Sequence, residues 1–270
     1  MTPAAPARPA RDPLARLVGL EGVGSALAAA RDGIDALLRD RGLRRTGPEL
    51  TGELLLRGAQ ASAVLEGSPV ELAVLRAGEG DDVARSAVRL STELLGLLPT
   101  LAAAPLQALA RMHAVAAGDP GRGPVRDPDV GRPRDAASAA RLRDLGALLT
   151  TPTAAPALLV AAVAHAELAT AAPFPSHNGL VARALERLVL VARGVDPASL
   201  VVPEAGHLRL RREYESNLRG YARGGVAGVH GWLLYAAEAY AAGAEASPLV
   251  VRGPQMQTAP RSRRDAAADT

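Results

Sequence analysis

Hydrophobic residues recur along most of the chain at the three- and four-residue spacing that is typical of amphipathic helices. The pattern predicts helices over residues 13–41, 48–66, 69–76, 81–98, 104–117, 136–149, 153–171, 179–193, 207–221 and 226–245. We expect the first helix to break near Gly19–Gly24. Pro48 suits a first helical turn, Gly67 a helix end and Asp81 an N-cap. The pattern therefore predicts an all-α fold.

Three segments depart from this periodicity. Residues 118–135, GDPGRGPVRDPDVGRPRD, are crowded with glycine and proline and predict a loop or a short irregular hairpin. Residues 1–12 and 247–270 are rich in proline, alanine and arginine, and we expect both to be disordered tails. Between the tails we separate a set of N-terminal helices, residues 13–100, from a core over residues 101–246.

Composition supports the helical prediction and excludes several classes of function. Hydrophobic residues make up 48% of the chain and aromatic residues only 2%, and alanine and leucine are strong helix formers. The net charge is only +3, with arginines interspersed among acids, so we expect no nucleic-acid partner. Without cysteine there is no disulfide, thiol nucleophile or thiolate metal site. No apolar run is long enough to span a membrane, and we expect a cytoplasmic protein.

The stretch AAPFPSHNGLVARALERL, residues 171–188, is the candidate for chemistry. Pro173 and Pro175 each fix their own φ and disfavour helix in the preceding residue. The helix before them must therefore end, and Phe174 is held extended between them. We expect this side chain, the only phenylalanine of the chain, to anchor the loop in the core.

The tip of this loop consists of Ser176, His177 and Asn178. Asparagine tolerates turn geometry, and Gly179 lets the backbone approach a ligand closely. The following helix points its first N–H groups and the positive end of its dipole at the tip, which favours an anion such as phosphate. The spacing alone also fits an ordinary corner between two helices, capped by asparagine or serine.

PFPSHNGLVAR resembles the signature of Fic (Fido-fold) proteins, H-x-F-x-[D/E]-G-N-[G/K]-R-x-x-R. Four residues match the signature at its fixed positions: Phe174, Asn178, Gly179 and Arg183. Four depart from it: Ala172 stands at the histidine, Ser176 at the acid, His177 at the first glycine and Leu180 at the first arginine. The signature is therefore degenerate in this chain.

Other segments resemble the same family in the same order, together covering residues 45 to 245. HAELATAAPF from His165 is similar to the helix that leads into the signature, and residues 109–126 to the helix before the β-hairpin flap. Residues 212–240 are similar to the closing helices. SAVLEG resembles the inhibitory motif [S/T]-x-x-x-E-[G/N], with Ser62, Glu66 and Gly67 at its fixed positions. The resemblance implies a Fic-like helical bundle with a short β-hairpin flap within residues 118–135.

The resemblance implies an enzyme that transfers AMP from ATP to a protein hydroxyl. In the family, the signature histidine is the general base and the signature acid is the Mg²⁺ ligand. Ala172 cannot accept a proton, which removes a contribution of roughly 10²–10⁴ in rate. Ser176 cannot replace a carboxylate as ligand of a hard cation. Leu180 removes a cationic phosphate contact. We therefore expect no catalytic residue and no metal site here, and His177 is not favoured as a substitute base.

We accordingly expect a catalytically degenerate Fic-like protein that acts as a nucleotide- or protein-binding regulatory module. ATP or ADP would bind without Mg²⁺, and the flap at 118–135 would hold a protein segment. Homodimers are compatible with the family. The alternatives are an active transferase of a phosphate-containing group with altered chemistry, and a purely structural scaffold.

Charged residues retained from the motifs give a further expectation. Glu66 and Arg183 should pair and clasp the N-terminal helices to the core, as the resemblance implies for the inhibitory glutamate. We expect His165 to be a core histidine donating to a backbone carbonyl, and His113 to pack near the flap. No metal cluster is expected among the five histidines.

Overall fold

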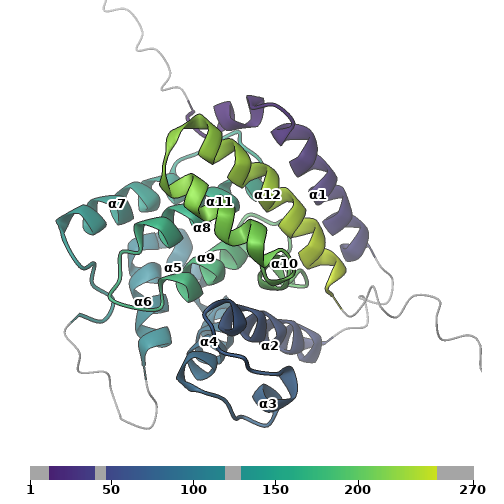
Figure 1. Ribbon diagram of the computed structural model, residues 1–270, viewed down its shortest axis with the longest axis vertical. Helices are drawn as coiled ribbons and strands as arrows, with labels where there is room; N and C mark the ends of the chain where they lie inside the picture. Colours follow the sequence, from purple (N-terminus) through teal and green to yellow (C-terminus); the bar gives the residue numbers. More distant parts are fainter. Residues whose placement is uncertain (1–11, 40–46, 119–128, 248–270) are drawn as a thin grey trace, which may run out of the picture.

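The computed structural model describes residues 12–39, 47–118 and 129–247, and helices make up most of this part of the chain (Figure 1). In chain order they are η1 (Ala15–Gly19), α1 (Val23–Leu38), α2 (Pro48–Leu65), α3 (Leu72–Arg76), α4 (Asp82–Glu93), η3 (Leu95–Leu97), α5 (Leu98–Ala103), α6 (Pro105–Ala117), α7 (Ala136–Thr150), α8 (Ala157–Ala171), α9 (Asn178–Ala192), α10 (Pro203–Arg209), α11 (Arg211–Ala222) and α12 (Gly225–Glu245). The elements labelled η are 3₁₀-helices. The predicted all-α class is confirmed.

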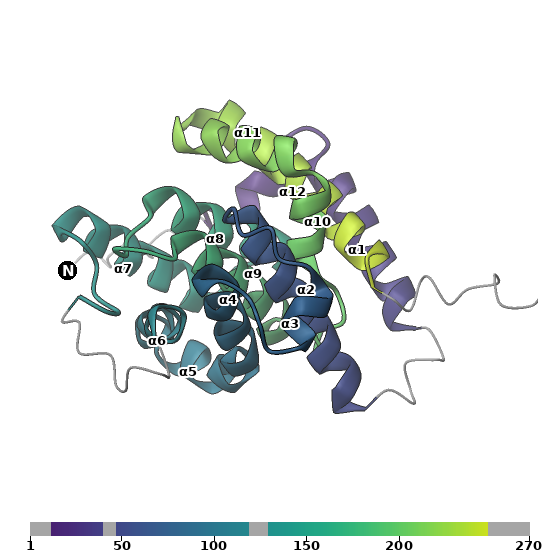
Figure 2. The same ribbon diagram turned by 60° about the horizontal axis from the view of Figure 1, so that its bottom comes forward.

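Helices α8 and α9 form the centre of the molecule, and the other helices pack around them. Turned by 60°, the molecule shows α11 and α12 on one side of this pair and α5 and α6 on the other (Figure 2). α12 packs against α1, α10 and α11, while α2 packs against α4 and α10. Both α11 and α12 also contact α8, and both α4 and α6 contact α9. Residues of α9 are therefore within reach of helices from both sides.

The burial of α8 and α9 follows from their composition. In α8 every residue from Leu158 to Ala166 is buried, so the helix is apolar all round rather than amphipathic. In α9 the buried run from Leu180 to Val191 includes three charged residues: Arg183, Glu186 and Arg187. Buried charges must be paired or hydrogen-bonded. We therefore expect polar partners for these three side chains in the interior of the protein.

Several helix ends lie where the sequence places them. Gly22, with a φ of 74°, separates η1 from α1 inside the expected break. The carboxylate of Asp81 accepts a hydrogen bond from the N–H of Ala84 at 2.8 Å and caps α4. Gly67 ends α2 with a φ of 94°, a conformation that residues with a Cβ rarely adopt. The expected single helix over 207–221 is instead two helices, because Leu210 leaves helical geometry (φ −108°, ψ 38°) between α10 and α11.

The predicted β-hairpin is not seen. Its middle, residues 119–128, lies outside the described residues, and on either side Gly118 and residues 129–135 form no strand. The predicted tails also lie outside the described residues, except for Asp12 and Ser247. The carboxylate of Asp12 is anchored, since it accepts hydrogen bonds from the Thr153 hydroxyl and the Ala154 N–H, both at 2.8 Å. Within the described ranges, none of the helices has the length and apolar character needed to cross a bilayer.

Candidate functional site

The loop between α8 and α9 is held in an unusual backbone conformation. Ala172 ends α8 with a φ of 40°, and His177 precedes α9 with a φ of 57°. Non-glycine residues seldom adopt positive φ, and such strain persists only where the surroundings enforce it. The two prolines and Phe174 lie between these positions, and the loop turns the chain sharply from one central helix into the next.

Asn178 enforces this conformation from within the loop. Its Oδ1 accepts a hydrogen bond from the N–H of Phe174 at 2.9 Å, and its Nδ2 donates to the Phe174 carbonyl at 2.8 Å. Both amide atoms of the side chain are therefore engaged with one backbone unit. The asparagine that the signature places at the phosphate cradle holds the loop shape here.

Phe174 and His113 connect the loop to the residues that follow 119–128. Phe174 is buried, as expected, and its ring stacks on His113 with centroids 4.5 Å apart. His113 Nδ1 accepts a hydrogen bond from the Gly131 N–H at 2.9 Å, and the Arg134 N–H donates to the Pro173 carbonyl at 2.8 Å. His113 thus contacts residues 129–135, a described part of the segment in which the flap was predicted. Residues 129–135 are therefore hydrogen-bonded both to His113 and to the loop between α8 and α9.

Arg183 is the buried cation of the site. Its side chain is 2% exposed, and its Nε donates to the Ser62 hydroxyl at 2.7 Å while NH2 donates to the Ser62 carbonyl at 3.2 Å. NH2 also donates to Glu66 Oε1 at 2.7 Å, and NH1 to the Tyr214 hydroxyl at 3.1 Å. The expected Glu66–Arg183 ion pair is present, and Ser62 and Glu66 reach it together because they lie one turn apart at the end of α2.

Glu66 occupies the position where the sequence predicted an anion. Its carboxylate lies directly against Gly179 in the first turn of α9, so close that a Cβ at that position would collide with Oε1. The first N–H groups of a helix and its dipole attract negative charge there. The side chain is 32% exposed, so the carboxylate closes the site from the solvent side. A carboxylate of the chain itself therefore lies at the start of α9, where the sequence predicted an anion.

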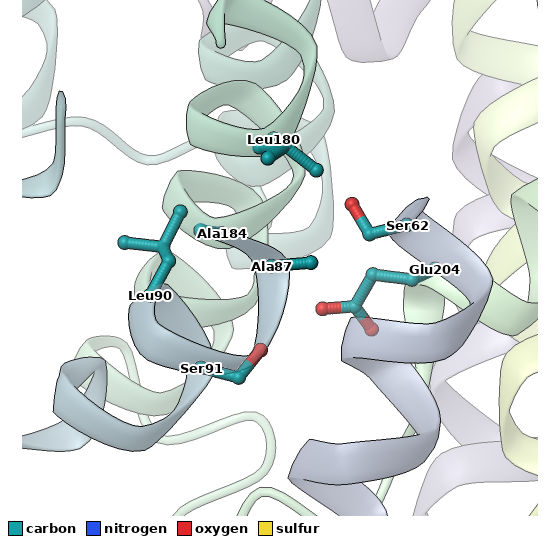
Figure 3. A pocket seen from close by; sticks show the side chains of 7 residues that line it. All are labelled: Ser62, Ala87, Leu90, Ser91, Leu180, Ala184 and Glu204. Atoms are coloured by element: carbon teal, nitrogen blue, oxygen red, sulfur yellow. The ribbon is translucent and has the colours of Figure 1, made fainter. Parts of the chain in front are cut away.

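Two positions that differ from the signature, Ala172 and Leu180, have no side chain suited to the family chemistry. Ala172 presents only a methyl group. Leu180 is 2% exposed and points, with Ser62 and Ala87, into a cavity of about 10 Å³ between α9, α2 and α4 (Figure 3). That volume is room for about one water molecule. The position of the first signature arginine is therefore part of the packed interior.

Ser176, at the position of the signature acid, belongs to a short chain of polar groups. Its hydroxyl lies 2.6 Å from His177 Nδ1 and 3.4 Å from His113 Nε2. Burial and the nearby charge of Arg89 lower the pKa of His177, against the opposing effect of Glu66. His177 is therefore kept neutral at physiological pH, and it does not add a cation to the anion site.

A second polar cluster, which the sequence analysis missed, lies directly behind Arg183. Glu186 Oε2 accepts hydrogen bonds from His165 Nδ1 at 2.9 Å and from His207 Nε2 at 2.8 Å, while Oε1 accepts from the Tyr240 hydroxyl at 2.8 Å. Both histidines and the glutamate are fully buried. His165 is a core histidine as expected, but its partner is a carboxylate rather than a backbone carbonyl. Charged residues inside the otherwise apolar α9 were the signal that could have revealed the cluster.

His165, Glu186 and His207 also present the donor set of a metal site, with ligand atoms within 4.8 Å of one another. The sequence analysis did not bring these three residues together. Zinc ligands lie about 2.0–2.2 Å from the metal, which places ligand atoms of a tetrahedral site more than 3 Å apart. The two N–O distances of 2.8 and 2.9 Å are instead hydrogen-bond distances. The arrangement fits a hydrogen-bonded network better than it fits a metal.

The pKa shifts agree with this network. Burial lowers the pKa of His165, more strongly than Glu186 raises it, so the imidazole is neutral. Burial alone would raise the pKa of Glu186, but the two imidazoles outweigh it and lower the pKa well below its usual range. Burial raises the pKa of Tyr214 and Tyr240, so their hydroxyls remain protonated. The cluster therefore holds an ionised carboxylate that accepts hydrogen bonds from the neutral His165 and from the Tyr240 hydroxyl.

Comparison with known proteins gives matches among solved structures. No family model matches the sequence, and a search of curated proteins finds no match. A Fic family protein from Desulfovibrio desulfuricans G20 superposes with a TM-score of 0.63 at 18% identity, over 82% of this chain and 74% of that chain. Fic-1 from C. elegans gives a TM-score of 0.59 at 19% identity, over 81% of this chain and 70% of that chain. A variant of Fic-1 gives 0.61 at 19%, over 86% and 72%.

Fold and site together define a class: a helical protein in which a strained loop leads into a helix whose start lies against an internal glutamate–arginine pair. At the identities found, the likeness to solved structures shows the architecture. The chain has the Fic fold.

Proposed function

We propose that this protein is a Fic-fold binding or regulatory module that does not transfer AMP by the mechanism its resemblance implies. The observation that carries the proposal is the packing of the altered signature positions. Ala172 and Leu180 place a methyl group and a buried apolar side chain where that mechanism uses a base and a phosphate-binding arginine. Ser176 offers a hydroxyl where it uses a carboxylate. Within the described residues we find no set of side chains around the loop that would take over these roles.

The groups that bind anions without metal are retained. The start of α9 and the guanidinium of Arg183 both attract negative charge, and the carboxylate of Glu66 lies against both of them. A nucleotide or another phosphate-bearing ligand would therefore bind after Glu66 is displaced. Because no carboxylate stands at the position of the metal ligand, this binding should not depend on Mg²⁺.

Calorimetric titration with ATP, ADP and AMP, with and without Mg²⁺, tests the proposal. We expect weak binding that Mg²⁺ does not change, and an affinity about tenfold higher in Glu66→Ala, equivalent to about 1.4 kcal/mol. Glu245→Ala is the matched control, because it breaks an exposed ion pair with Arg209 far from the loop. Absence of binding in both the wild type and Glu66→Ala would refute the binding role and favour a scaffold.

A transferase with altered chemistry is the second candidate, and one observation favours it. His113 Nδ1 accepts the Gly131 N–H, so the neutral ring carries its proton on Nε2 and can donate to Ser176. The Ser176 hydroxyl is then free to donate to His177 Nδ1, a neutral base. Incubation with labelled ATP and other nucleotides separates the candidates. Label on any protein that disappears in Asn178→Ala would overturn the first proposal.

A further inference from the structure

A continuous chain of hydrogen bonds leads from Arg183 into the interior. Arg183 donates to the Tyr214 hydroxyl at 3.1 Å, and that hydroxyl lies 3.0 Å from His165 Nε2. His165 is followed by Glu186 and then by His207, as described above. The chain ends where His207 Nδ1 lies 2.7 Å from the Tyr235 hydroxyl. It joins α9, α11, α8, α10 and α12 through side chains that are all buried.

The protons on the links from Arg183 to Glu186 can be assigned, because Arg183 only donates and Glu186 is ionised. Because the Tyr214 oxygen accepts from Arg183, its own proton is donated to His165 Nε2. His165 must then carry its proton on Nδ1, which donates to the ionised Glu186. His207 donates to the same carboxylate from Nε2, and its Nδ1 is hydrogen-bonded to the Tyr235 hydroxyl. From Arg183 to Glu186 the dipoles point toward the carboxylate, and aligned hydrogen bonds of this kind polarise one another.

The chain runs beside a reporter group. Trp232, on α12, is the only tryptophan of the sequence and is fully buried. Its ring centroid lies 5.2 Å from that of His165 and 6.3 Å from that of Tyr214. A change in the hydrogen bonding of His165 therefore takes place in direct contact with the indole.

We propose that this chain transmits the state of the Glu66–Arg183 pair to the aromatic cluster around Trp232, so that displacement of Glu66 is sensed on α12. The two states are Arg183 paired with Glu66 and Arg183 released from it. In the second state the guanidinium charge is no longer offset, and it polarises the Tyr214 hydroxyl more strongly. Tyr214 is the positioning residue that links the two regions. The release of Glu66 by a ligand rests on the proposed function, whereas the chain itself does not.

The test replaces the pair partner directly and needs no ligand. Glu66→Ala should shift the ¹⁵N resonances of His165, which can be assigned because the chain has five histidines, and should change the emission of Trp232. In the background of Tyr214→Phe, which keeps the ring but removes the link, both changes should be lost. The matched control is Tyr221→Phe. Tyr221 lies on the same helix as Tyr214, and its ring centroid is 6.4 Å from that of Trp232. Its hydroxyl donates to Glu167, which is not part of the hydrogen-bond chain.

Two results would overturn the proposal. The first is the absence of any change at His165 and Trp232 in Glu66→Ala. The second is an equal change in the Tyr214→Phe background, which would show an electric field acting through space. If Tyr214→Phe does not fold, fluorotyrosine labelling provides a second test. Glu66→Ala should then shift the ¹⁹F signals of Tyr214 and Tyr235 but not that of Tyr221. Equal shifts at all three tyrosines would also overturn the proposal. A failure to bind nucleotide contradicts the proposed function and leaves these readouts intact.

Discussion

Asn178 illustrates how one residue can keep its position in a motif while its interactions are internal. The sequence analysis placed it among the anion-binding residues because it matches the signature. In the structure both polar atoms of its side chain hold the backbone of Phe174, and Phe174 in turn stacks on His113. The amide side chain cannot cradle a phosphate without releasing the loop. The side chain of Asn178 therefore stabilises the conformation of the loop and is not available to a ligand.

The buried histidine–glutamate cluster makes the stability of the fold depend on pH. The pKa of His165 in the folded protein is lower than its ordinary value of 6.5. Below pH 6.5 the imidazole is therefore protonated in the unfolded chain before it is protonated in the folded one, which favours unfolding. The pKa of Glu186 is also lowered, from 4.5, and its stabilising contribution is lost as the pH falls below that value. Both effects have the same sign. We expect the free energy of unfolding to fall from pH 7 to pH 5, by up to about 1.4 kcal/mol per pH unit for His165, and to fall further below pH 4.5.

Urea unfolding monitored between pH 4 and pH 8 measures this dependence. His177→Gln is the control, since the pKa of His177 is also lowered but its side chain lies near the surface of the loop. Most of the slope should persist in that variant. A free energy of unfolding that stays constant between pH 5 and pH 7 would contradict a neutral, buried His165.

At the scale of secondary structure, the crossing of α10 and α12 depends on a glycine. Gly206 lies against the backbone of α12, and a Cβ there would collide with the carbonyl of Ala239. The Val202 N–H donates to the Gly243 carbonyl at 3.2 Å, so the two helices are also hydrogen-bonded where they meet. This close crossing brings His207 and Tyr235 to within 2.7 Å of each other. The packing of two elements thus builds the end of the buried chain.

Gly206→Ala should therefore destabilise the protein by about 1–3 kcal/mol or more, because the obstructing atoms belong to backbone that cannot rotate away. Gly33→Ala is the matched control: Gly33 lies within α1 with no atom near its added Cβ, and alanine should stabilise that helix by up to ~1 kcal/mol. Thermal unfolding of the two variants beside the wild type measures both effects. Equal melting temperatures for all three would show that α10 can move away from α12 without cost.

At the scale of the whole molecule, helices from both ends of the chain share one hydrophobic core. The largest cluster of buried apolar side chains includes residues from Leu14 to Ala244, and α1 packs on α12 although they are far apart in sequence. Arg187 adds a buried polar link, donating to the Leu54 carbonyl of α2 at 3.3 Å and to Glu204 of α10 at 3.1 Å. The N-terminal helices are therefore attached to the core through both apolar and polar contacts.

We accordingly expect the described part of the chain to unfold in a single cooperative transition. The emission of Trp232 reports the C-terminal helices, whereas far-UV circular dichroism reports all helices together. In urea the two signals should give the same midpoint. An earlier transition in circular dichroism would instead show that the helices before residue 100 unfold as a separate unit.

Local patterns predicted the helices, their caps and the position of the loop, because periodicity, Gly67 and Asp81 act over a few residues. The Glu66–Arg183 contact was also foreseen, since two motif residues of opposite charge implied it. The partners of His165 were not, because Glu186, His207 and Tyr214 reach it from three other helices and no short spacing connects them. The splitting of residues 207–221 into α10 and α11 at Leu210 was also missed, because the helical spacing of apolar residues continues across the break.

Glu66 is the residue immediately after α2, beyond Leu65, whereas Ser62 lies a full turn inside the helix. Helix ends fray far more readily than helix interiors. The carboxylate can therefore swing away when the last turn of α2 unwinds, while Ser62 continues to hold the guanidinium. Fraying of the residues after Ser62, or rotation of the Glu66 side chain, is sufficient to open the site, and neither requires the protein to unfold as a whole.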